Sequence, residues 1–224
     1  MKRHATRQLW SSLLASVLAF GARAGQAQSS AAPRAAAGDA RAAENPKAQA
    51  ARELFTEGKA KWASAEFEAA ISLFSASLEQ LPKASTFTLL ADSYEHLGRL
   101  RSARDTFQRA AELARQAKNE QLAQIAHTRE AALAPRIPQL EIRVLTTLPG
   151  LRVMLNGVEV GPRWLNVPIP MDAGAYQLEA RATGYVPSLT SVRLNNPSTQ
   201  PAAVQVVQVT LTPESAQPKV PLQP

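Results

Sequence analysis

Few residues in this sequence have the types and spacing that chemistry requires. Cysteine is absent, which excludes a thiolate metal site, a cysteine nucleophile and a disulfide. Outside the first residues of the chain only His96 and His127 remain, too few for a histidine-based metal site, and we expect both to be exposed or capping. No His-Glu-x-x-His pattern, glycine-rich phosphate loop or Gly-x-Ser-x-Gly elbow is present. We therefore expect no enzyme, no metal ion and no cofactor.

A cluster of arginines is interrupted by acidic residues. Asp105 and Glu112 interleave with Arg99, Arg101, Arg104, Arg109 and Arg115, a pattern typical of a solvated helix face. The net charge is +7, but Lys2, Arg3, Arg7 and Arg23 belong to the leader described below. Without them 21 basic residues oppose 18 acidic ones, so we expect no nucleic-acid partner.

The residues between 46 and 134 predict five helices. Asn45-Pro46 is a capping residue followed by a favoured first helical residue, Leu81-Pro82 ends the second helix, and Asn119 caps the fifth. The predicted ranges are 46–62, 65–81, 84–97, 100–117 and 120–134. We expect the fifth helix to cover the exposed face of the second hairpin through the stripe Leu122, Ile125, Ala126, Arg129 and Leu133.

Small and aromatic residues repeat after 33 positions in this region. Gly58, Phe67, Ala70 and Phe74 of the first copy correspond to Ala91, Leu100, Ala103 and Phe107 of the second, and such a period is typical of stacked helical hairpins. The arrangement resembles the tetratricopeptide repeat family, although the family's early Trp is Leu54 or Phe87 here. The resemblance implies a protein-binding scaffold with no chemistry of its own. The alternative is a generic helical bundle.

One face of the first helix carries side chains suited to binding a partner. Arg52, Phe55, Lys59 and Trp62 lie within about a quarter of the helix circumference, whereas Leu54 and Gly58 are expected to pack inside. The resemblance implies that this face lines a concave groove, joined by Thr88, Asp92 and Glu95 of the second hairpin. We expect a protein or peptide partner there. The alternative is that Phe55 and Trp62 are covered by the spacer, the fifth helix or the β domain.

After Pro135–Pro138 the hydrophobic period changes from helical to alternating, which marks a domain boundary. Short strands follow, and Asn156-Gly157 predicts a tight hairpin. The prolines of Val167–Pro170 limit that segment to an edge strand or to no strand at all. Asp172 is interpreted as a turn residue, and Val206-Val207 predicts a bulge. Residues 138–212 are therefore expected to form a small antiparallel β-sandwich. The two prolines of the connector predict one fixed orientation of the two domains.

The β region is similar to PEGA-type domains of bacterial envelope and surface proteins. The similarity is carried by Asn156-Gly157, Gly161, Pro168, Gly174 and Gly184-Tyr185. The motif that names the family is replaced here by Pro149-Gly150-Leu151-Arg152.

Both ends of the chain predict segments outside these domains. Residues 1–24 resemble a signal peptide, with basic residues, an apolar stretch from Leu9 to Phe20 and the cleavage site Ala22-Arg23-Ala24, or the next choice at Ala27. The apolar stretch is shorter than the roughly 20 residues that span a bilayer, so we expect no membrane span after cleavage. Residues 25–44 are expected to be a disordered spacer, and 213–224 a disordered Pro-rich tail.

The sequence thus predicts an α+β protein with two domains, helical repeats at 45–134 and a β-sandwich at 138–212. Its predicted location is periplasmic or extracellular, associated with the bacterial envelope. The function that we expect is non-enzymatic protein binding or scaffolding through the helical repeats. The alternative is a structural protein whose β domain contacts the cell wall or surface.

Overall fold

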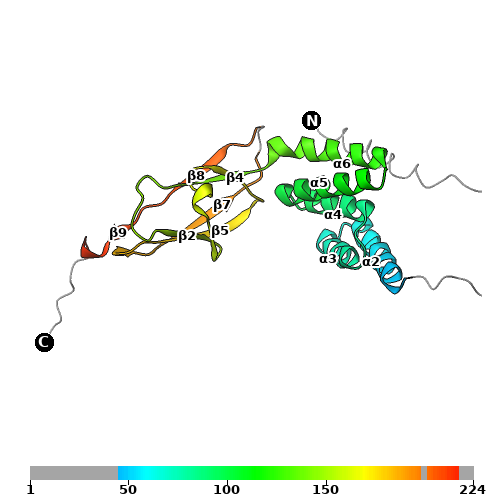
Figure 1. Ribbon diagram of the computed structural model, residues 1–224, viewed down its shortest axis with the longest axis horizontal. Coiled ribbons are helices and arrows are strands. Elements are labelled where there is room, and N and C mark those ends of the chain that lie inside the picture. The colour runs from blue at the N-terminus through cyan, green and yellow to red at the C-terminus, as the bar shows by residue number, and fades with distance from the viewer. Residues whose placement is uncertain (1–44, 198–200, 217–224) are drawn as a thin grey trace, which may run out of the picture. The chain divides into compact units, whose positions relative to one another are not determined.

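The computed structural model describes residues 45–197 and 201–216. Within these ranges five helices are followed by nine short strands (Figure 1), so the α+β prediction is confirmed. The predicted signal peptide at 1–24 and spacer at 25–44 lie outside the described residues, as does the end of the predicted tail from 217 onward.

The helices begin and end within two residues of the predicted positions. Their bounds are α2 Pro46–Ala63, α3 Phe67–Gln80, α4 Ala84–His96, α5 Leu100–Gln116 and α6 Glu120–Leu133. Both predicted caps are present: Asn45 Oδ1 accepts a hydrogen bond from Lys47 N, and Asn119 Oδ1 accepts one from Leu122 N, each at 3.0 Å. Local capping chemistry therefore sets where these two helices start.

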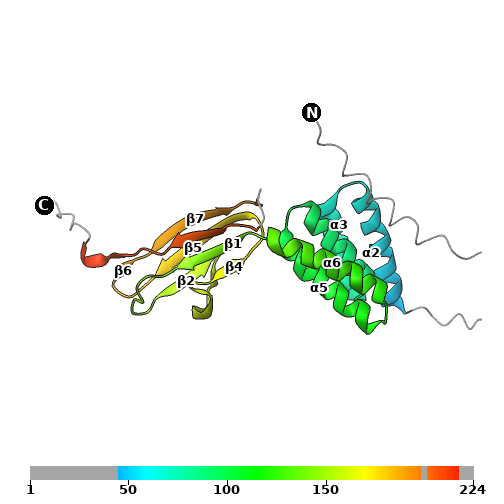
Figure 2. The ribbon, with the colours of Figure 1, turned by 90° about the horizontal axis from the view of Figure 1, so that it is seen from above.

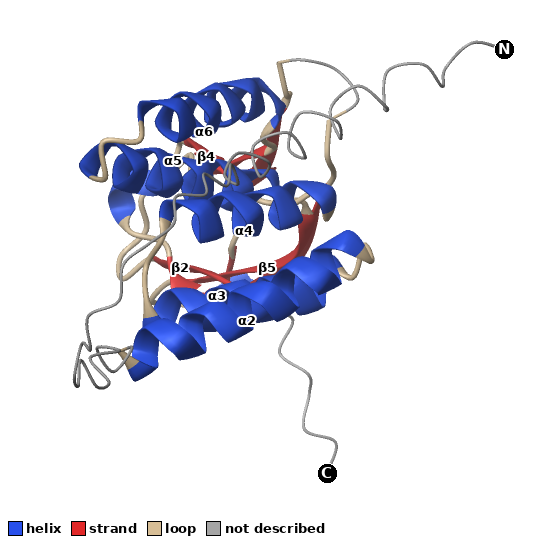
Figure 3. Cartoon of the chain, turned by 90° about the vertical axis from the view of Figure 1, so that its right-hand side faces the viewer, coloured by secondary structure: helices blue, strands red, loops and turns tan. Residues whose placement is uncertain are grey.

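The helices stack in chain order, from α2 and α3 to α6 (Figure 3). The repeated small and aromatic residues form their contacts, since Ala70, Phe74, Ala103 and Phe107 are all fully buried. Gly58 makes the closest approach, because a Cβ added there would lie 2.7 Å from Cε1 of Phe74. Each hairpin thus pairs a small residue with a large ring.

The predicted apolar stripe of α6 is partly wrong. Leu133 and Ala126 are buried as expected, but Ile125 is 45 % exposed and Ala123 is buried in its place. The reason is that α6 packs closely on α5, and such an approach favours the small Ala123 over the larger Ile125. The prediction placed the large side chain of Ile125 at the contact, and that placement was wrong.

Two sheets share one apolar core in the C-terminal half, where β1, β4, β5 and β7 lie alongside one another (Figure 2). The antiparallel sheet has the order β3-β2-β5-β7, with β3 Val158–Glu159, β2 Arg152–Leu155, β5 Gly174–Arg181 and β7 Ser188–Leu194. The other has the order β4-β1-β8, with β4 Pro168–Pro170, β1 Gln139–Arg143 and β8 Val204–Gln208. Leu140 and Ile142 of one sheet pack against Val153 and Leu178 of the other.

The Asn156-Gly157 turn and the edge position of Pro168–Pro170 are both as predicted. Asn156 and Gly157 have φ of 49° and 79°, as a two-residue hairpin turn requires, and β4 pairs only with β1 among the described strands.

Three details of the β prediction are wrong. β1 and β8 pair in parallel, so the three-stranded sheet is mixed. Their register runs without interruption through Val206 and Val207, so no bulge lies there. The alternation of apolar and polar residues is broken in the sequence because Val204 and Val206, although apolar, face outward and are about two-fifths exposed. Finally, β9 Thr212–Pro213 pairs with β6 Tyr185–Val186, so regular structure extends into the predicted tail.

We predict that Gly58→Ala destabilises the protein. Alanine in a helix interior normally stabilises by about 1 kcal/mol over glycine, but the added Cβ would overlap the buried ring of Phe74. The free energy of unfolding, measured in urea, should fall by about 1–3 kcal/mol. Adding Phe74→Leu to this variant should recover part of the loss, because a smaller side chain makes room. An unchanged or increased stability of the single variant would contradict the close packing.

Candidate functional site

Side chains from α2, α4 and α6 meet on one face of the helical region. α4 contacts both α2 and α6, so residues about one repeat apart become neighbours. We call this surface the α2–α4–α6 face and define it by Phe55, Lys59, Trp62, Asp92, Glu95 and Arg129.

A chain of hydrogen bonds crosses this face. Trp62 Nε1 donates to Asp92 Oδ2 at 2.8 Å, linking α2 to α4. Arg129 Nη2 donates to Asp92 Oδ1 at 2.8 Å and to Glu95 Oε2 at 2.9 Å, linking α4 to α6. Arg136 Nη1, just beyond α6, donates to Glu95 Oε1 at 3.0 Å. Three helices are therefore joined by one continuous polar network.

The two carboxylates of the network are mostly buried, and the pKa of one of them, Glu95, is shifted by its partners. The Asp92 and Glu95 side chains are only 15 % and 22 % exposed. Burial by itself would raise the pKa of Glu95, but the hydrogen bonds and charges of Arg129 and Arg136 outweigh burial and lower the pKa. Burial likewise opposes the charge of Arg129, yet its bonds to Glu95 and Asp92 raise the pKa of its guanidinium.

The remaining predicted site residues lie near this network or apart from it. The Phe55 ring is partly buried with its centroid 6.0 Å from that of Phe74, and Lys59 Nζ lies 5.8 Å from the Phe55 centroid. Arg52 is exposed. Thr88 Oγ1 donates to the carbonyl of Ala84 in its own helix at 2.9 Å. The structure thus brings Trp62 to Asp92 and places Glu95 beside them, and it forms a separate pair from Phe55 and Lys59.

The two histidines lie at helix surfaces. His96 is exposed, its Nε2 lies 3.3 Å from Asp92 Oδ2, and its ring stacks on Phe67 with centroids 4.3 Å apart. His127 is exposed and its Nδ1 lies 3.1 Å from Glu130 Oε2.

Sequence reasoning missed the two arginines that bind the acidic pair. Arg129 was assigned to the packing stripe of α6, yet its position was a signal, since it lies 34 residues after Glu95, one residue more than the repeat length. Nothing in the local sequence indicates the contact of Arg136. Because Asp92 and Glu95 are paired with Arg129 and Arg136, their negative charges are largely neutralised at this surface.

Asp172, interpreted from the sequence as a turn residue, also caps a helix. Its Oδ1 accepts hydrogen bonds from the backbone N–H groups of Arg101 and Ser102 at 2.7 and 3.1 Å, and its Oδ2 accepts one from Ser102 Oγ. The residue before α5 is Arg99, whose side chain makes no capping bond. A helix start without a local hydrogen-bond acceptor needs an acceptor from elsewhere in the chain. The missing cap before α5 was therefore the signal in the sequence that a distant residue caps this helix.

The described residues hold neither a candidate metal site nor a candidate membrane-spanning helix. Across 45–197 and 201–216, no group of three or more His, Cys, Asp or Glu side chains is arranged to hold a metal ion. Within the same residues, no helix has both the length and the apolar character needed to cross a bilayer.

Comparison with known proteins gives little further information. No protein-family model matches the chain, and neither does any curated protein. Among solved structures it is similar to the solution structure of protein BPP2914 from Bordetella parapertussis, with 21 % identity and a TM-score of 0.36. The match covers 38 % of this chain and 74 % of the Bordetella protein.

We predict that Glu95→Gln destabilises the protein in a pH-dependent way. The folded-state pKa of Glu95 is lowered, so its stabilisation is present above the unfolded value of about 4.3 and is lost as the pH falls through the folded-state pKa. At pH 7 the free energy of unfolding should fall by about 1 kcal/mol, since the partners are partly exposed. The difference from wild type should shrink towards pH 3.

Unfolding in urea at the two pH values measures this difference. Glu57→Gln, at an exposed position of α2, is the matched control and should change stability little at either pH. A difference for Glu95→Gln that is equal at pH 7 and pH 3 would show that the ion pairs do not carry the effect.

Proposed function

We propose that this protein is a non-enzymatic binding or scaffolding component of the bacterial envelope, which holds a protein or peptide partner on its α2–α4–α6 face. The observation that carries the proposal is the continuous network from Trp62 through Asp92 and Arg129 to Glu95. It holds a partly exposed aromatic side chain in one rotamer on a surface formed by three helices.

A fixed aromatic side chain is well suited to binding. Tryptophan and tyrosine dominate interface energetics, and a side chain that is already immobilised loses less entropy when a partner binds. Trp62 is held by its indole N–H, and Phe55 by its contact with the buried Phe74. Both remain partly exposed.

The charges of the face favour a partner that binds mainly through apolar side chains. Asp92 and Glu95 are engaged by Arg129 and Arg136, so they offer little attraction to a basic partner. Lys59 is exposed beside Phe55 and can receive a carboxylate. The partner that fits is a segment with large apolar residues and an acidic residue at one end.

The resemblance to tetratricopeptide repeats supports this proposal, since that family binds peptides on the first-helix face. The predicted signal peptide supports an envelope location.

The alternative is a structural protein whose β domain contacts the envelope. It is favoured by large apolar side chains that are exposed on that domain, among them Leu145 at 68 % and Leu189 at 67 %. Side chains of this kind are common at contacts with other molecules.

We predict that Phe55→Ala and Trp62→Ala each remove partner binding and lower the melting temperature only modestly, because both side chains are partly exposed. Cross-linking of the protein in cells, followed by mass spectrometry, identifies the partner; affinity for it is then measured with each variant. Removal of a hot-spot side chain should weaken binding by about 2 kcal/mol or more. Trp62→Phe separates the two roles of the indole, because it keeps an apolar ring but loses the bond to Asp92.

Leu189→Ala on the β domain is the control and should bind as wild type does. If Leu189→Ala loses the partner and the helical variants keep it, the alternative is supported. A large drop in melting temperature for Phe55→Ala and Trp62→Ala would make these residues part of the core and contradict the proposal.

A further inference from the structure

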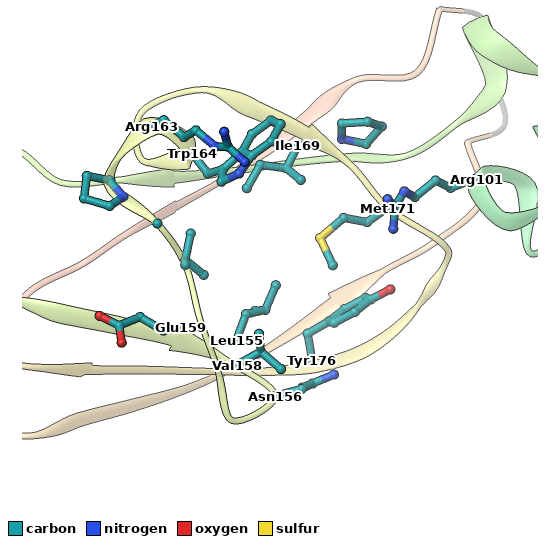
Figure 4. A pocket seen from close by; sticks show the side chains of 14 residues that line it. Arg101, Leu155, Asn156, Val158, Glu159, Arg163, Trp164, Ile169, Met171 and Tyr176 are labelled. Carbon is teal, nitrogen blue, oxygen red and sulfur yellow. The ribbon is translucent and has the colours of Figure 1, made fainter. Parts of the chain in front are cut away.

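An open cleft of about 950 Å³ lies in the β region (Figure 4). It is lined by the β2–β3 hairpin, by the short 3-10 helix η3 Pro162–Trp164, and by β4 with the start of β5. None of the residues that define the α2–α4–α6 face lines it. Its volume is at the upper end of the range of about 300–1,000 Å³ typical of ligand sites.

The cleft is open because two edge strands border it. β3 is the edge of the four-stranded sheet and β4 is an edge of the three-stranded sheet. Ile169 of β4 lies opposite Leu140, while its neighbours Pro168 and Pro170 have no backbone N–H. That edge therefore cannot accept an added strand along its whole length.

The β3 edge differs, because its backbone keeps its polar groups. Val160 N donates to Val153 O at 2.8 Å, and in an antiparallel pair successive residues alternate in direction. The N–H and C=O of Glu159 therefore face away from β2 and can bond to an extended chain.

The floor and walls of the cleft are apolar. Leu155 and Val158 lie on one side of it and Ile169 and Met171 on the other (Figure 4). Val158 is 71 % exposed and Trp164 is 41 % exposed. Side chains of this size in contact with solvent around a concave surface are typical of a binding site.

The charge that the cleft leaves unneutralised is positive. Glu159 is paired with Arg152 at 2.7 Å and Arg101 with Asp105 at 3.4 Å. Arg163 lies over the indole of Trp164, 5.2 Å from its centroid, and no carboxylate of the described residues pairs with it. A guanidinium on an aromatic ring keeps its N–H donors available for a carboxylate.

We propose that this cleft binds an extended segment of a partner protein in which aliphatic residues adjoin acidic residues. The aliphatic side chains fill the apolar floor, a carboxylate bonds to Arg163, and the backbone of the segment meets that of Glu159. The site is independent of the partner on the helical face.

The test uses two synthetic octapeptides with blocked ends. The first, Asp-Glu-Val-Ile-Val-Leu-Asp-Glu, has an aliphatic centre and acidic ends; the second has Lys at every acidic position. Binding to the purified protein is measured by calorimetry and by the indole N–H signals of Trp62 and Trp164 in NMR spectra. The acidic peptide should bind with a Kd of about 10–100 µM and shift the Trp164 signal, while the Trp62 signal reports separately on binding at the α2–α4–α6 face.

Variants then test which residues of the protein bind the acidic peptide. Arg163→Gln should weaken binding about tenfold, and Trp164→Leu should weaken it at least as much. Arg193→Gln is the matched control, since Arg193 is an exposed arginine on β7 that does not line the cleft. If Trp164→Leu fails to fold, Arg163→Gln still decides, because it removes only a charge on the surface.

Several results would overturn the proposal. These are equal binding of the two peptides, no binding of the acidic peptide at 1 mM, or an equal loss with Arg193→Gln and Arg163→Gln. Self-association in sedimentation that Val158→Asp abolishes would assign the cleft to a second copy and overturn it as well.

Discussion

The close approach of α2 to α3 is the contact on which the rest of the helical region depends. Gly58 lies against the fully buried Phe74, so the ring occupies space that any other side chain would fill. The same arrangement recurs in the second hairpin, where Ala91 and Phe107 share one core. A packed interior has few alternative arrangements, so these contacts set the spacing of the stack. That spacing brings α2, α4 and α6 close enough for their polar side chains to meet.

The polar network contributes more to arrangement than to net stability. Bringing charged groups out of water offsets much of the gain from pairing them, and Arg129 and Arg136 are each 36 % exposed. The bonds are directional, however: Arg129 meets Asp92 and Glu95, and Arg136 meets Glu95. They therefore hold α6 at one place along α4, and they fix the indole of Trp62 through Asp92. Binding surfaces benefit from such preorganisation.

The β region is organised by its edges. Pairing of β1 with β8 in parallel joins the first and late strands of the domain, which lie more than sixty residues apart. The edge strands of the two sheets are then β8 and β4 in one and β7 and β3 in the other. The prolines of β4 protect its edge, whereas β3 is short and open. Val158 and Trp164 line the cleft beside these edges and stay exposed, because neither sheet extends far enough to cover them.

The sequence by itself determined the helices, the hairpin turn and the edge strand. Capping by Asn45 and Asn119, helix termination at Pro82 and the left-handed turn at Asn156-Gly157 act over a few residues, so they can be read without knowledge of the fold. The face with Trp62, Asp92 and Glu95 was also predictable, because helical periodicity and the 33-residue repeat place them together.

Only the tertiary structure decided which partners these residues have. The pairing of Arg136 with Glu95 and the capping of α5 by Asp172 join residues about 40 and 70 positions apart. The parallel pairing of β1 with β8 and the exposure of Ile125 were decided in the same way. Each depends on the distance and angle between packed elements, which are set by the sum of many weak contacts, so the local sequence does not identify the partner.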